Sequence, residues 1–279
     1  MKAIEKVAIA NRGEVAVRII RACEELDIRS VLLHSDVDRH TLGFRLSDEQ
    51  ICIGGAASQE SYLNIDNVIS GALKANADAI HPGFGFLSEN AEFADAVSKA
   101  GLTFIGPTGA SIRQLGDKIA AKALARQLGI SMVPGYQGAD QSVPQLMAEA
   151  KRIGPPLIIK SAAGGGGRGM KILTDLSDAK LVMELIESAQ REAQAAFGSP
   201  VVFLEKYLDH AKHIEVQIFG DGTGDATHLF ERECSVQRRH QKIIEEASAT
   251  TLPENPRQQM CEAAVRLAKA CQYRGAGTV

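Results

Sequence analysis

The sequence is poor in the cysteine and aromatic residues that disulfide-linked, zinc-binding or aromatic-rich proteins contain. It has no tryptophan, and aromatic residues occupy only 5% of its 279 positions. Its five cysteines stand apart from one another, at Cys23, Cys52, Cys234, Cys261 and Cys271. An odd number of scattered cysteines without a Cys-x-x-Cys pair predicts neither a disulfide framework nor a zinc site. We therefore expect a reduced, cytoplasmic protein.

Long apolar segments and a strong net charge are missing as well. No apolar run approaches the roughly 20 residues that span a bilayer, and no apolar signal-peptide core follows the charged opening Met1–Lys6. Lys and Arg total 31 against 34 Asp and Glu, a net charge of −3. This balance argues against nucleic acid or an anionic membrane as the main partner.

What remains is typical of a globular chain, with 45% apolar residues and a length that suits one large domain or two ordinary ones. Over the first 115 residues, strand and helix patterns alternate. Short apolar runs predict strands at 6–10, 30–34, 77–81 and 102–105. Helical spacing of apolar residues begins at Glu14, at Tyr62 and around Phe93. This alternation favours a parallel sheet with both faces covered.

The rest of the chain has a different pattern, in which strands come to dominate. Helices are predicted at 120–128, 146–153 and 177–196, and strands at 157–160, 170–173, 201–204, 214–219 and 226–230. The Gly- and Pro-rich segment 134–144 is interpreted as a loop, and Asp221–Gly224 as a hairpin turn. The predicted fold class is α/β, with a parallel-sheet domain followed by an α+β domain.

The strongest local signal is the glycine-rich segment 163–169. Its letters match the dinucleotide fingerprint, but a strand, not a helix, is predicted to follow, and the chain has no Gly-Lys pair for a Walker A loop. A glycine-rich loop between strands can place backbone N–H groups over phosphate oxygens. A flexible surface turn accounts for the same glycine-rich sequence about equally well. Lys160, just before it, favours the phosphate interpretation, because a buried ammonium group needs a partner.

Two polar clusters further along leave alternatives open. His213, Glu215 and Gln217 alternate along one predicted strand and should face the same side, either as a solvated edge or as the wall of a ligand cavity. Residues 238–242 are either a solvated basic turn or a pocket for a small oxyanion or a nucleotide phosphate. Lys118, taken alone, is most simply a solvated helix lysine.

Several of these segments together resemble the biotin carboxylases. The matching blocks run in order along the chain: Ala8–Glu14, Ala79–Asn90, Gly164–Met170, Glu205–Leu208, Arg238–Lys242 and Tyr273–Thr278. The resemblance implies a pre-ATP-grasp domain over residues 1–115 and an ATP-grasp domain over residues 116–279. A lid at about 132–204 would hinge at Pro134–Gly138 and near Glu205.

The resemblance also implies an activity. Biotin carboxylases use MgATP to activate bicarbonate as carboxyphosphate and then carboxylate biotin on a carrier protein or domain. This is the first half-reaction of acetyl-CoA carboxylase, which serves fatty acid biosynthesis, and of related enzymes. The implied cofactors are ATP with Mg²⁺ or Mn²⁺, and the implied partners are bicarbonate, the carrier, a carboxyltransferase and a second copy of the chain.

Roles for individual residues follow from the same resemblance. The residues implied to bind ATP are Lys118, Lys160, Gly166, Gly167, Met170, Glu205, Lys206, Tyr207, Leu208, His213, Gln237 and His240. Lys242 is implied to bind bicarbonate and is the catalytic candidate. Phosphoryl transfer needs positioning and charge neutralisation more than covalent help, which suits this set.

No metal ligand is expected within the chain. In the family, a metal-binding Glu follows the segment that ends here at Val279, and a second Glu, an Asn and an Arg come later. If these residues are the whole molecule, we expect that it lacks the metal ligands and the catalytic Arg and does not turn over.

Three other interpretations compete with this one. The chain could belong to an ATP-grasp ligase that activates a different acid, which ADP release indifferent to bicarbonate would reveal. It could be a non-catalytic module that binds nucleotide or a partner. A Rossmann-type dehydrogenase is disfavoured by the context of the glycine loop, and retention of NAD would revive it.

Overall fold

The computed structural model describes residues 3–162, 170–238 and 241–279. The chain divides into two compact units. One consists of Met1–Gly116 with Ile218–Thr227 and Ala268–Gly277, and the other of Asp117–Gln217, His228–Leu267 and Thr278–Val279. None of the helices in the described ranges is long and apolar enough to cross a membrane.

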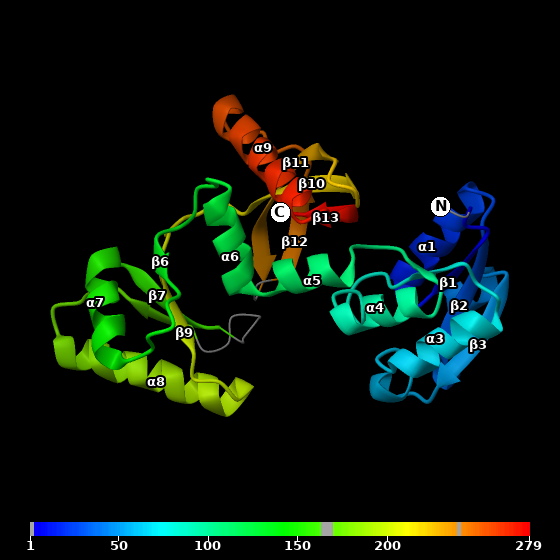
Figure 1. The fold of residues 1–279 in the computed structure, drawn as a ribbon, viewed down its shortest axis with the longest axis horizontal. Coiled ribbons are helices and arrows are strands. Elements are labelled where there is room, and N and C mark those ends of the chain that lie inside the picture. The colour runs from blue at the N-terminus through cyan, green and yellow to red at the C-terminus, as the bar shows by residue number, and fades with distance from the viewer. Residues whose placement is uncertain (1–2, 163–169, 239–240) are drawn as a thin grey trace. The chain divides into compact units, whose positions relative to one another are not determined.

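The first sheet has five parallel strands, in the order β3-β2-β1-β4-β5. Figure 1 labels β1, β2 and β3 of this sheet. Its strands are β1 (Lys6–Ile9), β2 (Arg29–Ser35), β3 (Glu49–Gly54), β4 (Ala79–His81) and β5 (Thr103–Phe104). The parallel sheet expected from the alternating pattern is therefore confirmed. The sequence patterns missed β3, because it lies at the sheet edge with most of its residues half-buried and gives little alternation.

Helices cover both faces of this sheet because successive strand residues point to opposite sides. Val7 and Ile9 pack in one cluster with residues of α1 (Gly13–Glu25). Ala8 and Ile80 pack in another with residues of α3 (Ile65–Lys74) and α4 (Ala91–Lys99). The short elements of this region are η1 (Asp36–His40), α2 (Leu42–Leu46), η2 (Ser58–Glu60) and α5 (Gly109–Gly116).

The second sheet is antiparallel, in the order β6-β9-β7-β8. Its strands are β6 (Gly135–Tyr136), β7 (Leu157–Ser161), β8 (Lys171–Leu173) and β9 (Val202–Lys206). Two helices, α7 (Val143–Ile153) and α8 (Ala179–Phe197), bury one face of it, with Leu146, Ile159, Ile186 and Leu204 in the shared core. The helix α6 (Lys118–Gln127) precedes this sheet in the chain.

Several boundaries differ from the sequence prediction; the strand predicted at 226–230, for example, continues to Arg238. The segment 134–144 is not simply a loop, because Gly135 and Tyr136 pair with Glu205 and Leu204 of β9, and α7 begins at Val143. The strand predicted at 201–204 continues to Lys206. In both places a cross-strand hydrogen-bond partner far away in the sequence extends the strand, which local composition does not report.

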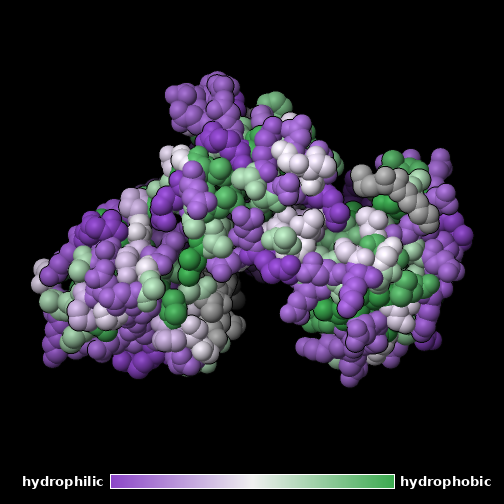
Figure 2. All heavy atoms as spheres, in the orientation of Figure 1, coloured by the Kyte–Doolittle hydropathy of each residue, from purple (hydrophilic) through white to green (hydrophobic). Residues whose placement is uncertain are grey.

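The third sheet has the order β12-β11-β10-β13. Its strands are β10 (Ile214–Asp221), β11 (Ala226–Arg238), β12 (Gln241–Glu246) and β13 (Arg274–Thr278). The helix α9 (Glu254–Ala270), which the sequence patterns missed, buries only the small residues Cys261, Ala264 and Ala268. Figure 2 shows hydrophilic residues over much of this helix, so its apolar stripe is too weak for a periodicity argument to detect.

Candidate active site

The second sheet presents a polar pair on the face away from α7 and α8. Lys160 lies opposite Phe203 in the β7–β9 register, and Glu205 lies opposite Ile158. The period of two in both strands therefore places Lys160 and Glu205 on one face as diagonal neighbours. The Nζ atom of Lys160 donates to Oε2 of Glu205 at 2.5 Å. The structure thus brings together two residues that the resemblance assigned to the same nucleotide.

A second lysine shares this carboxylate. Lys122 of α6 donates from Nζ to Oε1 of Glu205, and the same ammonium group lies 5.1 Å from the ring centre of Phe203. The Glu205 side chain is 11% exposed, so it lies almost out of water between its two lysine partners. Such burial strengthens the ion pairs relative to pairs at the surface.

The end of β9 and the residues after it are held to neighbouring loops by hydrogen bonds. Lys206 donates from Nζ to the carbonyl oxygens of Gly154 (3.2 Å) and Pro155 (2.6 Å), just after α7 ends. The side chain of Leu208 is exposed, and the backbone N–H of Tyr207 donates to the carbonyl of Pro156. The backbone N–H of Lys206 donates to the carbonyl of Pro134, so the end of β9 is held at both its main chain and its side chain.

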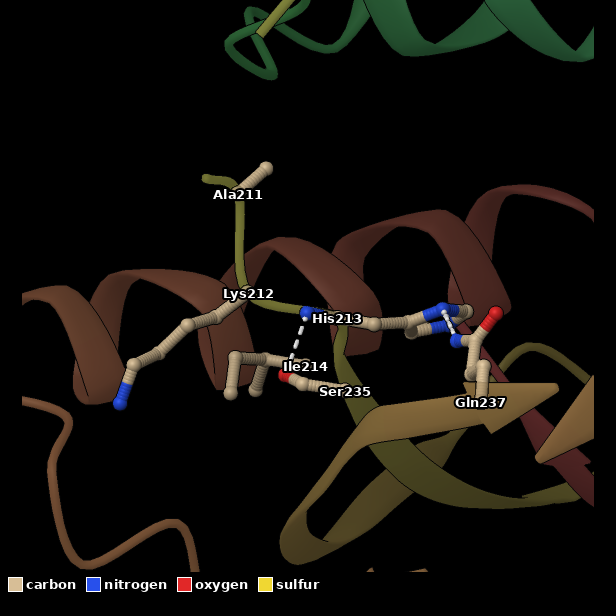
Figure 3. A pocket seen from close by; sticks show the side chains of 6 residues that line it. All are labelled: Ala211, Lys212, His213, Ile214, Ser235 and Gln237. Carbon is tan, nitrogen blue, oxygen red and sulfur yellow. Dashed lines mark hydrogen bonds between the residues drawn. The ribbon is translucent and has the colours of Figure 1, made fainter. Parts of the chain in front are cut away.

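An open pocket of about 500 Å³ lies where β10 begins, beside the C-terminal end of β11. Its lining residues are Ala211, Lys212, His213, Ile214, Ser235 and Gln237. Figure 3 shows the His213 ring and the Gln237 amide pointing toward each other, while Lys212 extends away from them. The Nε2 of Gln237 donates to Nδ1 of His213 and to the Cys234 carbonyl, both at 2.8 Å. In the neutral ring the proton therefore lies on Nε2, as a hydrogen-bond donor.

Lys242 lies in a dense charge cluster between β10, β11 and β12. Its Nζ donates to Oε2 of Glu215, which is buried. Arg232 donates from Nε to Oε1 of Glu215 at 2.9 Å and from Nη1 to Gln217 Oε1 at 2.8 Å. Because Arg232 contacts both Glu215 and Gln217, the two side chains face the same way, as their alternation predicts.

The electrostatics of this cluster favour the ionised forms. Burial by itself raises the pKa of Glu215, but hydrogen bonds from Lys242 and Arg232 outweigh it and hold the pKa below its ordinary value. Within the described residues, ligand atoms of Glu215, Cys234 and Glu245 lie within 4.8 Å of one another. Arg232 and Lys242 already neutralise that group, and burial raises the pKa of the Cys234 thiol. The group formed by Glu215, Cys234 and Glu245 is therefore a poor metal site.

Some predicted residues cannot be placed. Gly166, Gly167 and His240, together with the side chain of Lys118, lie outside the described residues. The strands that flank 163–169, β7 and β8, do pair antiparallel, as the hairpin interpretation requires. Met170 directly precedes β8 and is exposed at the margin of that segment.

Sequence reasoning missed two charged residues that the structure places in these clusters. Lys122 follows Lys118 by one helical turn, and that spacing within a predicted helix was the available signal. Arg232 gave no local signal, because its role comes from a strand partner 17 residues away, Glu215. Together the clusters supply cations that can hold phosphate or another oxyanion.

Comparison with known proteins bears on both units. Residues 3–112 match the family described as "Biotin carboxylase, N-terminal domain", and residues 117–279 match "Carbamoyl-phosphate synthase L chain, ATP binding domain". The chain is 49% identical over 279 residues to a biotin carboxylase of Pseudomonas aeruginosa, covering 99% of this chain and 61% of that protein.

Two solved structures are also similar. The Campylobacter jejuni biotin carboxylase–β,γ-ATP complex has a TM-score of 0.91 at 43% identity, covering 99% of this chain and 61% of that one. The biotin carboxylase domain dimer of Hydrogenobacter thermophilus 2-oxoglutarate carboxylase, in complex with MgADP, ADP and bicarbonate, has a TM-score of 0.88 at 40% identity. It covers 100% of this chain and 60% of that one.

A parallel-sheet domain followed by antiparallel sheets of this order defines an ATP-grasp protein with its preceding domain. Within that class, the chain belongs to the biotin carboxylase family. It spans 61% of the length of the Pseudomonas relative.

Proposed function

We propose that the protein acts in the ATP-dependent carboxylation of carrier-bound biotin by bicarbonate, through carboxyphosphate. One observation carries the proposal: Lys160 and Glu205, assigned to one nucleotide from separate motifs, are neighbours on one face of the second sheet. The comparisons support it, since relatives of this family have been solved with ATP or ADP and with bicarbonate.

The residues present fit a nucleoside triphosphate. In the proposal, Lys160 and Lys118 neutralise phosphate charge, and residues 163–169 close over the phosphates together with Met170. The segment Glu205–Leu208 binds the adenine and ribose, while His213, Gln237 and His240 make further ATP contacts. The cations would stabilise charge that develops during phosphoryl transfer.

Lys242 is proposed to bind bicarbonate. Its ammonium group is held by the buried Glu215 carboxylate, which also orients it. A lysine in this position can attract an oxyanion and keep it in place while the phosphoryl group is transferred. The side chain is about one third exposed, at 34%, so the amine remains reachable from solvent.

Mg²⁺ or Mn²⁺ bound with ATP would supply further charge neutralisation. The donor groups described here do not form a site for it, because Glu215 and Glu245 are already engaged by Arg232 and Lys242. We therefore propose no metal ligand within these residues. That the 279 residues by themselves do not turn over stays a prediction from the resemblance.

The organisation and partners are proposed on the same basis. We keep the domains at 1–115 and 116–279, with a lid at about 132–204. A homodimer is proposed because the Hydrogenobacter neighbour is described as a dimer. The carrier and the carboxyltransferase follow from the half-reaction. A cytoplasmic location suits the five free thiols.

Calorimetric titration with MgATP tests the nucleotide site. We expect Lys160→Ala to weaken MgATP binding by at least about tenfold, since it removes a charge-assisted contact to phosphate. Lys171→Ala is the matched control, because Lys171 lies on β8 of the same sheet and pairs at the surface with Glu192. The control should bind within about twofold of wild type. Equal affinity in wild type and Lys160→Ala would contradict the proposed site.

A further inference from the structure

Two lysines bind the two oxygens of one nearly buried carboxylate, that of Glu205. Lys160 reaches Oε2 of Glu205 and Lys122 reaches Oε1, from a strand and a helix respectively. The Glu205 side chain is 11% exposed, whereas those of Lys122 and Lys160 are 28% and 34% exposed. The two cations are thus closer to water than the anion between them.

The charges of these three groups do not cancel. Two ammonium groups and one carboxylate leave one excess positive charge, which favours the arrival of an anion such as a phosphate. Without Lys122, Lys160 and Glu205 would form a neutral, partly buried pair. Lys160 could then turn to a phosphate only by leaving a nearly buried carboxylate without a cation, which is costly.

We propose that Lys122 is a positioning residue for the nucleotide: it holds Glu205 so that Lys160 can transfer to the phosphates. This rests on the proposed function, since it assumes that ATP binds here. Lys122 acts through Glu205 and needs no contact with the phosphates. Its place over the Phe203 ring, with its ammonium 5.1 Å from the ring centre, keeps it beside Glu205 when Lys160 moves.

Titration of the 279-residue chain with two probes, MgATP and adenosine, tests the proposal. Lys122→Gln keeps a hydrogen-bond donor for Glu205 but removes the charge. We expect it to weaken MgATP binding about tenfold and to leave adenosine binding within about twofold of wild type, because only the phosphates need Lys160. Lys122→Arg retains the cation and should bind both probes as wild type does.

A double variant tests whether the negative charge of Glu205 is what holds Lys160. Replacing Glu205 by Gln in the Lys122→Gln background removes the anion that traps Lys160, so MgATP affinity should recover relative to Lys122→Gln alone. Lys122→Met, which loses both the charge and the hydrogen bond, should match the Lys122→Gln loss for MgATP.

The outcomes are distinct. If Lys122→Gln binds MgATP as tightly as wild type, or loses MgATP and adenosine equally, the positioning role is overturned and the proposed function stands. Failure of wild type itself to bind MgATP would overturn the proposed function, and the inference with it.

Discussion

At Glu215, a single carboxylate holds two cations from neighbouring strands. Arg232 and Lys242 both donate to it, and its side chain is 6% exposed. A buried carboxylate in this position must be ionised to satisfy its partners, and it fixes Lys242 where bicarbonate binding is proposed. Loss of the charge on Glu215 should therefore affect both the stability of the third sheet and the position of Lys242.

The pH dependence of stability tests this arrangement. Because the pKa of Glu215 is lowered in the folded state, its ion pairs stabilise the fold above the ordinary glutamate pKa of about 4.3. That stabilisation is lost as the pH falls through the lower folded-state pKa. We expect Glu215→Gln to lower the free energy of unfolding by about 1–3 kcal/mol at pH 7. Its difference from wild type should shrink below about pH 4.

Urea denaturation of both proteins at pH 7, 5 and 3 measures that difference. Glu246→Gln, which changes an exposed carboxylate on β12 of the same sheet, controls for the loss of one negative charge. A difference between wild type and Glu215→Gln that stays constant, or grows, as the pH falls would contradict the account.

At this scale the sequence predicts some contacts and misses others. The alternation of Glu215 and Gln217 predicts a shared face, and the structure confirms it through Arg232. Sequence spacing could not reveal that Arg232 or Lys122 would pair with these carboxylates, since each partner lies on another element. Side-chain pairing across elements depends on register and packing, which no local pattern encodes.

Among the elements, α6 connects stability to the nucleotide site. Asp117 caps it, accepting hydrogen bonds at Oδ1 from the N–H groups of Ile119 (2.8 Å) and Ala120 (3.1 Å). Lys118 is the first residue of the helix and Lys122 lies one turn later. Fraying of this first turn would move the backbone that carries both lysines.

Removal of the cap tests the link between α6 and nucleotide binding. We expect Asp117→Ala to lower the free energy of unfolding by about 1 kcal/mol and to weaken MgATP binding several-fold. Asp178→Ala is a matched control, because Asp178 caps α8 with similar hydrogen bonds to the N–H groups of Lys180 and Leu181. It should lower stability by a similar amount and leave MgATP binding unchanged. Equal effects of both variants on MgATP binding would contradict the account.

Long periodic elements follow from the sequence, whereas edges and small-residue faces do not. The helix expected over 177–196 appears as α8, Ala179–Phe197, because its apolar stripe covers the second sheet. In contrast, β3 and β6 become strands only through pairing with partners distant in the sequence. The polar helix α9 buries little more than Cys261, Ala264 and Ala268, so its pattern resembles that of an exposed segment.

At the scale of the whole molecule, the chain joins a parallel-sheet unit to one that carries the lysine clusters. The order of its strands and the match over both units place it in the biotin carboxylase family. The matching sequence blocks predict this family because several are long enough to be specific and all of them occur in the family's order along the chain. Bicarbonate as the activated acid is the central claim for function, and it depends on Lys242.

ADP release by a chimaeric enzyme tests most directly whether bicarbonate is the activated acid. In it, these 279 residues replace the matching 61% of the Pseudomonas aeruginosa biotin carboxylase. ADP release is followed with MgATP and free biotin, with and without bicarbonate, and Lys242→Ala in the same chimaera is the control. We predict ADP release that requires bicarbonate and falls at least about tenfold in the control. A chimaera that binds MgATP but releases ADP at the same rate with and without bicarbonate would contradict the account.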